Sequence, residues 1–195
     1  MGHYYKSGPG GRPNVVGAVL RGIPLVFEVP KGLFSSDKVD KGTELLAEFL
    51  EIPEEGKVLD VGCGYGVLGI LMAKLNPKLE VYMVDINPKA VEACKRNAEL
   101  NDVKVHVFQG NLYEPLDKAG IRDFVTIVSN PPLAAGREVV KEIIVGAKDR
   151  LAKGGSLQIV MAAGGKWAEE LMKNVFGNVE RKRKKGYTLL RSYKL

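Results

Sequence analysis

The chain has 195 residues, of which 45% are hydrophobic and 27% charged, and this size and composition suit one folded domain with a substantial core. No stretch approaches the roughly 18 apolar residues that a membrane span needs. The N-terminus lacks the apolar core of a signal peptide, so we expect a cytoplasmic protein without a membrane partner. The formal net charge of +6 favours polyanionic partners.

The N-terminal part of the chain predicts an arm, a hairpin and a helix. Residues 1–13 are rich in Gly and Pro and indicate an irregular arm. Two apolar runs at 15–21 and 24–29 flank a glycine and predict a β-hairpin. Thr43 stands where it can cap the N-terminus of the helix that follows.

From residue 57 the pattern changes to alternating strands and helices. Apolar runs between turn residues predict strands at 58–61, 81–84, 103–108, 124–128, 156–162, 179–184 and 187–193. Helical periodicity or capping predicts helices at 67–75, 88–100, 138–151 and 167–176. Such alternation predicts a Rossmann-like, doubly wound α/β fold with a mostly parallel seven-stranded sheet and an antiparallel hairpin at its edge. We divide the chain into an arm and β-hairpin extension, 1–42, and one globular domain, 43–195.

A glycine-rich loop follows the first strand of this domain. An acidic residue and three glycines at alternate positions define it: Asp60, Gly62, Gly64 and Gly66. Glycine permits the sharp turn and the close approach of backbone to ligand that such a loop requires. With Gly69 the loop also satisfies the dinucleotide pattern, so a nicotinamide-dependent oxidoreductase is the alternative. Asp60 argues against it, because a carboxylate repels a pyrophosphate but suits the ammonium and sulfonium groups of S-adenosylmethionine.

The loop resembles motif one of the class I S-adenosylmethionine-dependent methyltransferases, which implies S-adenosylmethionine as the cofactor. Asp85 ends the next strand. A carboxylate at this place, about 20 residues beyond the loop, can accept both ribose hydroxyls of a nucleoside. The alternative is that Asp85 only leads into the following helix. Ile86 would pack on the adenine face. The resemblance places Asn111 where this family binds the adenine amino group, and its amide retains an acceptor oxygen.

The strand at 124–128 leads into the tetrapeptide Asn130-Pro131-Pro132-Leu133. In isolation Asn-Pro indicates a turn. At the carboxyl end of a strand beside the glycine loop, it resembles the Asn-Pro-Pro-aromatic motif of methyltransferases that act on planar amide or amine nitrogens. These include base amino groups and the glutamine amide of release factors. The resemblance implies that the Asn130 side-chain oxygen and the Pro131 carbonyl each accept one substrate N–H, which is catalysis by positioning.

Leu133 departs from that motif, because the family carries an aromatic residue there. Stacking on the substrate is then lost or supplied elsewhere, with Phe34, Tyr4 and Tyr5 as candidates. The basic run at 181–185 suits phosphate contacts, and it equally suits the protection of an edge strand from aggregation.

The segment at 32–46 resembles the stretch before motif one in bacterial small-subunit ribosomal RNA guanine-N2 methyltransferases. It implies Phe34, Ser35 and Thr43 as cofactor contacts. We therefore expect methylation of an exocyclic amino nitrogen of an RNA base, foremost guanine N2 of ribosomal or transfer RNA. The alternatives are a protein glutamine-amide N-methyltransferase of the release-factor type and a cofactor-binding module without catalysis.

Two further expectations concern metals and assembly. The chain has two cysteines, Cys63 and Cys94, whose spacing fits neither a metal site nor a redox motif. We expect two buried thiols and no metal. The sequence gives no indication of the oligomeric state.

Overall fold

The computed structural model describes residues 12–33 and 37–195. Within these residues, a two-stranded hairpin precedes a seven-stranded sheet of order β5-β4-β3-β6-β7-β9-β8. The strands are β1 (Asn14–Leu20), β2 (Ile23–Val29), β3 (Gly56–Val61), β4 (Leu79–Asp85), β5 (His106–Gln109), β6 (Phe124–Ser129), β7 (Leu151–Met161), β8 (Glu180–Lys184) and β9 (Tyr187–Tyr193). The helices are α1 (Lys41–Phe49), α2 (Val67–Leu75), α3 (Pro88–Leu100), α4 (Glu114–Lys118), α5 (Gly136–Arg150), α6 (Gly165–Phe176) and the short 3₁₀ turn η1 (Leu133–Ala135).

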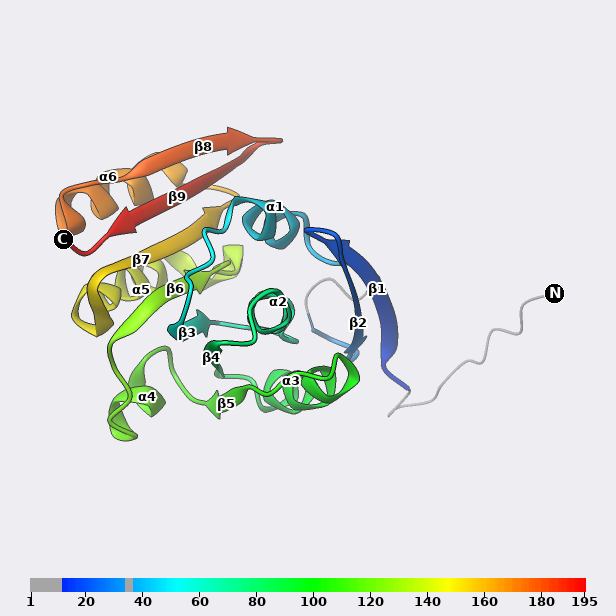
Figure 1. The fold of residues 1–195 in the computed structure, drawn as a ribbon. Helices are drawn as coiled ribbons and strands as arrows, with labels where there is room; N and C mark the ends of the chain where they lie inside the picture. Colours follow the sequence, from blue (N-terminus) through cyan, green and yellow to red (C-terminus); the bar gives the residue numbers. More distant parts are fainter. Residues whose placement is uncertain (1–11, 34–36) are drawn as a thin grey trace.

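The sheet is parallel from β5 to β7, and β9 and β8 close it as an antiparallel hairpin. Helices cover both faces: α1, α2 and α3 share one apolar cluster with the N-terminal hairpin, and α4, α5 and α6 share the other. Figure 1 shows β8 and β9 at the edge of the sheet opposite β5. The predicted Rossmann-like fold, the edge hairpin and the N-terminal β extension are confirmed.

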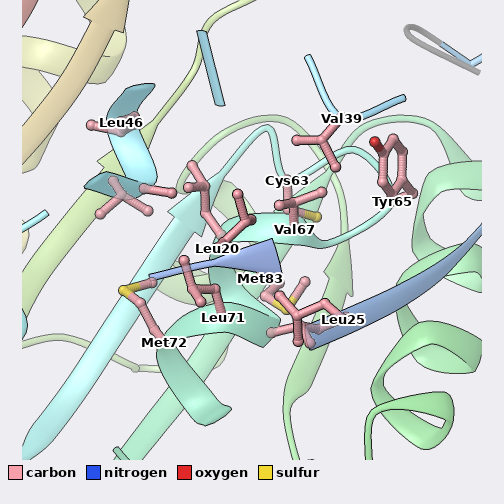
Figure 2. Packing of buried hydrophobic residues seen from close by; sticks show 14 of the residues in the cluster. Leu20, Leu25, Val39, Leu46, Cys63, Tyr65, Val67, Leu71, Met72 and Met83 are labelled. Carbon is pink, nitrogen blue, oxygen red and sulfur yellow. The ribbon is translucent and has the colours of Figure 1, made fainter. Parts of the chain in front are cut away.

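The N-terminal hairpin packs on the helical layer rather than on the sheet. Figure 2 shows Leu20 and Leu25 among Val67 and Leu71 of α2 and Met83 of β4. Burial of such side chains, at roughly 1.5–3 kcal/mol each, attaches the hairpin to α2. The division into residues 1–42 and 43–195 stays a prediction.

Asn97 of α3 and the C-cap of that helix, Asn101, close the outer edge of β2. The Asn97 amide binds the backbone N–H and C=O of Glu28 at 2.7 and 3.0 Å, and the Asn101 amide binds those of Val26 at 3.1 and 2.7 Å. Residues four apart lie on one face of a helix, and residues two apart lie on one edge of a strand. The two side chains therefore replace a neighbouring strand.

Several boundaries differ from those predicted. The helix expected at 138–151 ends at Arg150, and the strand expected from 156 begins at Leu151. The short helix α4 was not predicted. Thr43 was wrongly predicted as the cap of α1: the N-cap is Asp40, whose side chain accepts a hydrogen bond from the Thr43 N–H at 3.2 Å. An Asp at N-cap satisfies the free N–H of the first turn, which leaves the Thr43 hydroxyl for another partner.

Among the described helices, none combines the length and the apolar character needed to cross a membrane.

Candidate active site

A cavity of about 450 Å³ opens at the carboxyl ends of β3, β4 and β6. This volume and position are typical of small-molecule sites in doubly wound folds. Predicted site residues that line it are Thr43, Asp60, Gly62, Gly64, Asp85, Ile86, Asn111, Asn130, Pro131 and Pro132. Phe34, Ser35 and the side chain of Leu133 lie outside the described part of the structure, so their roles stay predictions.

The glycines of the loop serve different purposes. Gly62, Gly64 and Gly66 all have positive φ, at 68°, 56° and 105°, which a residue with a side chain adopts only under strain. A Cβ on Gly66 would stand 2.9 Å from Cε of Met83, and one on Gly69 would stand 2.6 Å from its Sδ. These two glycines let α2 pack closely on β4. Gly66 does not line the cavity, and its expected cofactor contact stays a prediction.

Asp60 is a buried carboxyl at the floor of the cavity, 2% exposed. Its Oδ2 accepts a hydrogen bond from the Gly69 N–H at 3.1 Å. Burial raises the pKa of Asp60 to about 7, the negative charge of Asp85 acts in the same direction, and the Gly69 hydrogen bond opposes them. Such a carboxyl is only partly ionised near neutral pH, and a cation beside it would favour its charged form.

Asp85 is held rigidly at the end of β4. Its Oδ2 accepts from the Gly64 N–H and its Oδ1 from the Asn87 N–H, both at 2.9 Å. Each oxygen retains a second lone pair, so the carboxylate can still accept two hydroxyls. The adjacent Ile86 is 67% exposed and lines the cavity, which gives the cavity an apolar rim on which a flat ring can pack. Asn111 lines the cavity beyond β5.

The Asn130 amide has a defined orientation. Its Nδ2 donates to Asp40 Oδ2 at 2.8 Å and to Thr43 Oγ1 at 2.9 Å. Both amide hydrogens are thereby used, and no described residue donates to the remaining oxygen, Oδ1. Because Asn130 and Pro131 line the cavity, the Asn130 oxygen and the Pro131 carbonyl are the acceptors this loop offers to a ligand.

The structure also identifies site residues that sequence reasoning missed. Asp40 and Tyr187 line the cavity, although they lie far from the glycine loop in sequence. Cys63 and Cys94 are buried as expected, but their sulfur atoms are also 3.4 Å apart, which the sequence did not indicate. The hydrogen bond with Cys94 and burial raise the pKa of Cys63 well above its usual range. No set of three or more His, Cys, Asp or Glu among the described residues could hold a metal ion.

Comparisons with known proteins agree with this geometry. Residues 25–191 match the family model described as the methyltransferase small domain. The chain is 36% identical to the uncharacterized protein YbxB of Bacillus subtilis, over 99% of this chain and 98% of that protein. It is 35% identical to the ribosomal RNA small subunit methyltransferase C of Escherichia coli, over 78% of this chain but 43% of that protein.

A solved structure of the T. thermophilus 16S rRNA N2 methyltransferase, in complex with S-adenosylmethionine and guanosine, superimposes with a TM-score of 0.85 at 28% identity. It covers 95% of this chain and 51% of that chain, so this chain spans about half the length of the ribosomal RNA enzymes that it matches. The fold, the glycine-rich loop after β3 and the comparisons together define a class I S-adenosylmethionine-dependent methyltransferase. Within that class, the chain belongs to the methyltransferase small domain family.

Proposed function

We propose that this protein transfers the methyl group of S-adenosylmethionine to an exocyclic amino nitrogen of a base in RNA, foremost guanine N2 of ribosomal RNA. The observation that carries the proposal is the fixed Asn130 amide, whose Oδ1 is left as an acceptor beside the cavity. Transfer RNA is the other candidate among RNA substrates.

The residues of the cavity fit the cofactor. Asp60 supplies a buried carboxyl whose charged form is favoured by an ammonium group, and the rigid Asp85 supplies acceptors for ribose hydroxyls. Ile86 offers an apolar face for adenine, and Asn111 offers an acceptor for its amino group. When bound, S-adenosylmethionine supplies an activated methyl group on a sulfonium.

The chemistry requires positioning rather than a strong base. An exocyclic amino nitrogen is a poor nucleophile, because its lone pair is delocalised into the ring. If Asn130 Oδ1 and the Pro131 carbonyl each accept one N–H, the lone pair turns toward the methyl carbon. The N–C bond forms as the S–C bond breaks, and the nitrogen then loses one proton. An Asn amide cannot take that proton, so the proton leaves to water after the transfer.

RNA is favoured over a glutamine amide by two observations. The relatives with a named activity reported above are ribosomal RNA methyltransferases, and the solved structure contains guanosine. The net charge of +6 suits a polyanion. A non-catalytic binding module is disfavoured, because a module that only binds cofactor has no need of an Asn130 amide held by two side chains.

The test uses tritiated-methyl S-adenosylmethionine, the purified protein and an extract from cells that lack it. We expect incorporated label that ribonuclease destroys and protease does not, and N2-methylguanosine among the digested nucleosides. Asn130→Ala is the control, which should bind the cofactor but transfer no label. Label that only protease removes would overturn the RNA proposal.

A further inference from the structure

Near Asn130, the cavity contains an aromatic ring of the kind that the tetrapeptide Asn130-Pro131-Pro132-Leu133 lacks. Among the described residues, two aromatic side chains line the cavity, Tyr65 and Tyr187. Tyr65 is 7% exposed and packs edge-on against Phe27 at 5.5 Å, so its ring belongs to the core. Tyr187 is half-buried and is the first residue of β9. Its ring is therefore the one placed to meet a ligand.

Tyr187 and Asn130 meet at Gly42. A Cβ on Gly42 would stand 3.1 Å from Tyr187 Cε1 and 3.3 Å from Asn130 Nδ2. The aromatic ring and the amide thus flank the same small space in the first turn of α1. A side chain at residue 42 would push them apart, and glycine lets them converge on the same part of the cavity.

Three lysines continue from Tyr187 along the outside of the hairpin. Lys184 pairs directly with Tyr187, and Lys182 pairs with Leu189, which belongs to the same apolar cluster that Tyr187 packs against. Directly paired residues project to the same face of a sheet. Lys182 and Lys184 therefore extend the face of Tyr187, and Lys185 follows in the turn.

These lysines are exposed and have no acidic partner in the described part of the chain. The turn also approaches the start of α1, where Lys185 lies near Lys41. The arginines of the same strand differ. Arg183 pairs with Thr188, on the α6 side, and Arg181 forms an ion pair with Glu169 of α6 at 3.0 Å. Protection of an edge strand from aggregation accounts for charged side chains on β8. It does not account for the position of Lys182 and Lys184 on the same face as Tyr187.

We propose that the β8–β9 hairpin is the RNA-docking element, in which Tyr187 stacks on the target base beside Asn130 and Lys182, Lys184 and Lys185 hold the flanking phosphates. A flipped or single-stranded nucleotide needs this combination of a ring for its base and cations for its backbone. The inference rests on the proposed function, because it requires RNA as the substrate.

The ring is tested by steady-state kinetics on RNA. Tyr187→Leu should lower kcat/KM about tenfold or more, the usual effect of losing one base–aromatic stack. Tyr187→Phe keeps the ring and should recover most of that loss. Calorimetry should give both variants a similar affinity for S-adenosylmethionine, which also shows that they are folded. If Tyr187→Leu stays within twofold of the wild type, the stacking role is wrong.

The lysines are tested by salt dependence. Lys182→Gln/Lys184→Gln should raise the KM for RNA and reduce the slope of log KM against log salt by about one to two, because each lost phosphate contact removes roughly one unit. Arg183→Gln removes a charge from the same strand on the opposite face and is the matched control, with no change expected. An equal effect of Arg183→Gln, or an unchanged slope in the lysine variant, would overturn the phosphate role.

The two failures are distinguishable. If the wild type labels protein instead of RNA, the proposed function fails and the docking inference fails with it. If the wild type labels RNA and the hairpin variants match it, only the docking inference is overturned. The lysine variants alter exposed side chains of an edge strand, so they remain a test even if Tyr187→Leu loses stability.

Discussion

Asp40 Oδ2 accepts a hydrogen bond from Asn130 Nδ2 at 2.8 Å, which joins the N-cap of α1 to the loop after β6 across 90 positions of sequence. The same oxygen accepts the Thr43 N–H, and the Thr43 hydroxyl accepts the second amide hydrogen of Asn130. One capping residue thus orients both a helix and the amide proposed to bind the substrate. This arrangement makes Asp40 a positioning residue, with an effect that kinetics can separate from its effect on stability.

The first prediction compares two substitutions at Asp40. Asp40→Ala removes the helix cap, at about 1 kcal/mol of unfolding free energy, and releases the Asn130 amide. Asp40→Ser retains a capping side chain but is too short to keep both contacts. We expect kcat for RNA methylation to fall about tenfold or more in both variants, whereas stability falls mainly in Asp40→Ala. Chemical denaturation and single-turnover kinetics measure the two effects. If kcat falls only in the destabilised variant Asp40→Ala, and Asp40→Ser is fully active, the positioning role is contradicted.

The second prediction concerns Asp85, whose oxygens bind two backbone N–H groups and line the cavity. Asp85→Ala should weaken S-adenosylmethionine binding by one to two orders of magnitude, roughly the 1.5–3 kcal/mol of charge-assisted hydrogen bonds. Calorimetry measures the affinity. Glu92→Ala, on the exposed side of α3, is the control, with no change expected. Unchanged affinity in Asp85→Ala would remove Asp85 from the site.

The third prediction is a pH dependence of stability caused by Asp60. Its pKa is raised to about 7 in the folded protein and is about 4 in the unfolded chain. The neutral carboxyl therefore stabilises the fold fully below pH about 4, and this contribution is lost as the pH rises to about 7. The total loss is of the order of 4 kcal/mol. Denaturation of the wild type and of Asp60→Asn should show the difference in unfolding free energy changing across that window. A constant difference would contradict the shifted pKa.

The same shift should make cofactor binding depend on pH. A bound ammonium favours the ionised carboxyl, so binding below pH 7 must first remove the proton from Asp60. The affinity of the wild type should rise up to tenfold per pH unit as the pH approaches about 7, and then level off. Asp60→Asn should lack this component, and comparison with it cancels any titration of the ligand itself.

How much could be read from the sequence depended on how local each interaction is. The alternation of strands and helices and the glycine loop follow from residues close in sequence, and the structure has both, with some boundaries shifted. Asp40 was missed because Asp and Thr are both good N-cap residues, so the local sequence does not show which of Asp40 and Thr43 caps α1. The hydrogen bonds that both make with Asn130 link residues far apart in sequence. The ring of Tyr187 and the contact of Cys63 with Cys94 likewise depend on strand order and helix packing, which local patterns do not specify.

The last prediction separates two asparagines at the C-terminal end of α3, Asn97 and the C-cap Asn101, that both hold the N-terminal hairpin. Asn97 is fully buried, and besides Glu28 its amide binds the carbonyl of Tyr65 in the glycine loop at 2.8 Å. Asn101 binds Val26 and its own helix, but not the loop. Asn97→Ala leaves the Tyr65 carbonyl and the part-buried N–H and C=O of Glu28 without these partners, so it should cost about 3 kcal/mol of unfolding free energy.

Because Asn97, unlike Asn101, also binds the glycine loop, Asn97→Ala should weaken S-adenosylmethionine binding several-fold, while Asn101→Ala should lower stability and leave the affinity unchanged. Denaturation and calorimetry on the two variants provide the comparison. Equal losses of affinity in both would mean that the hairpin as a whole, and not the Asn97–Tyr65 hydrogen bond, supports the loop. Unchanged affinity in both would mean that the loop keeps its conformation without the Asn97–Tyr65 hydrogen bond.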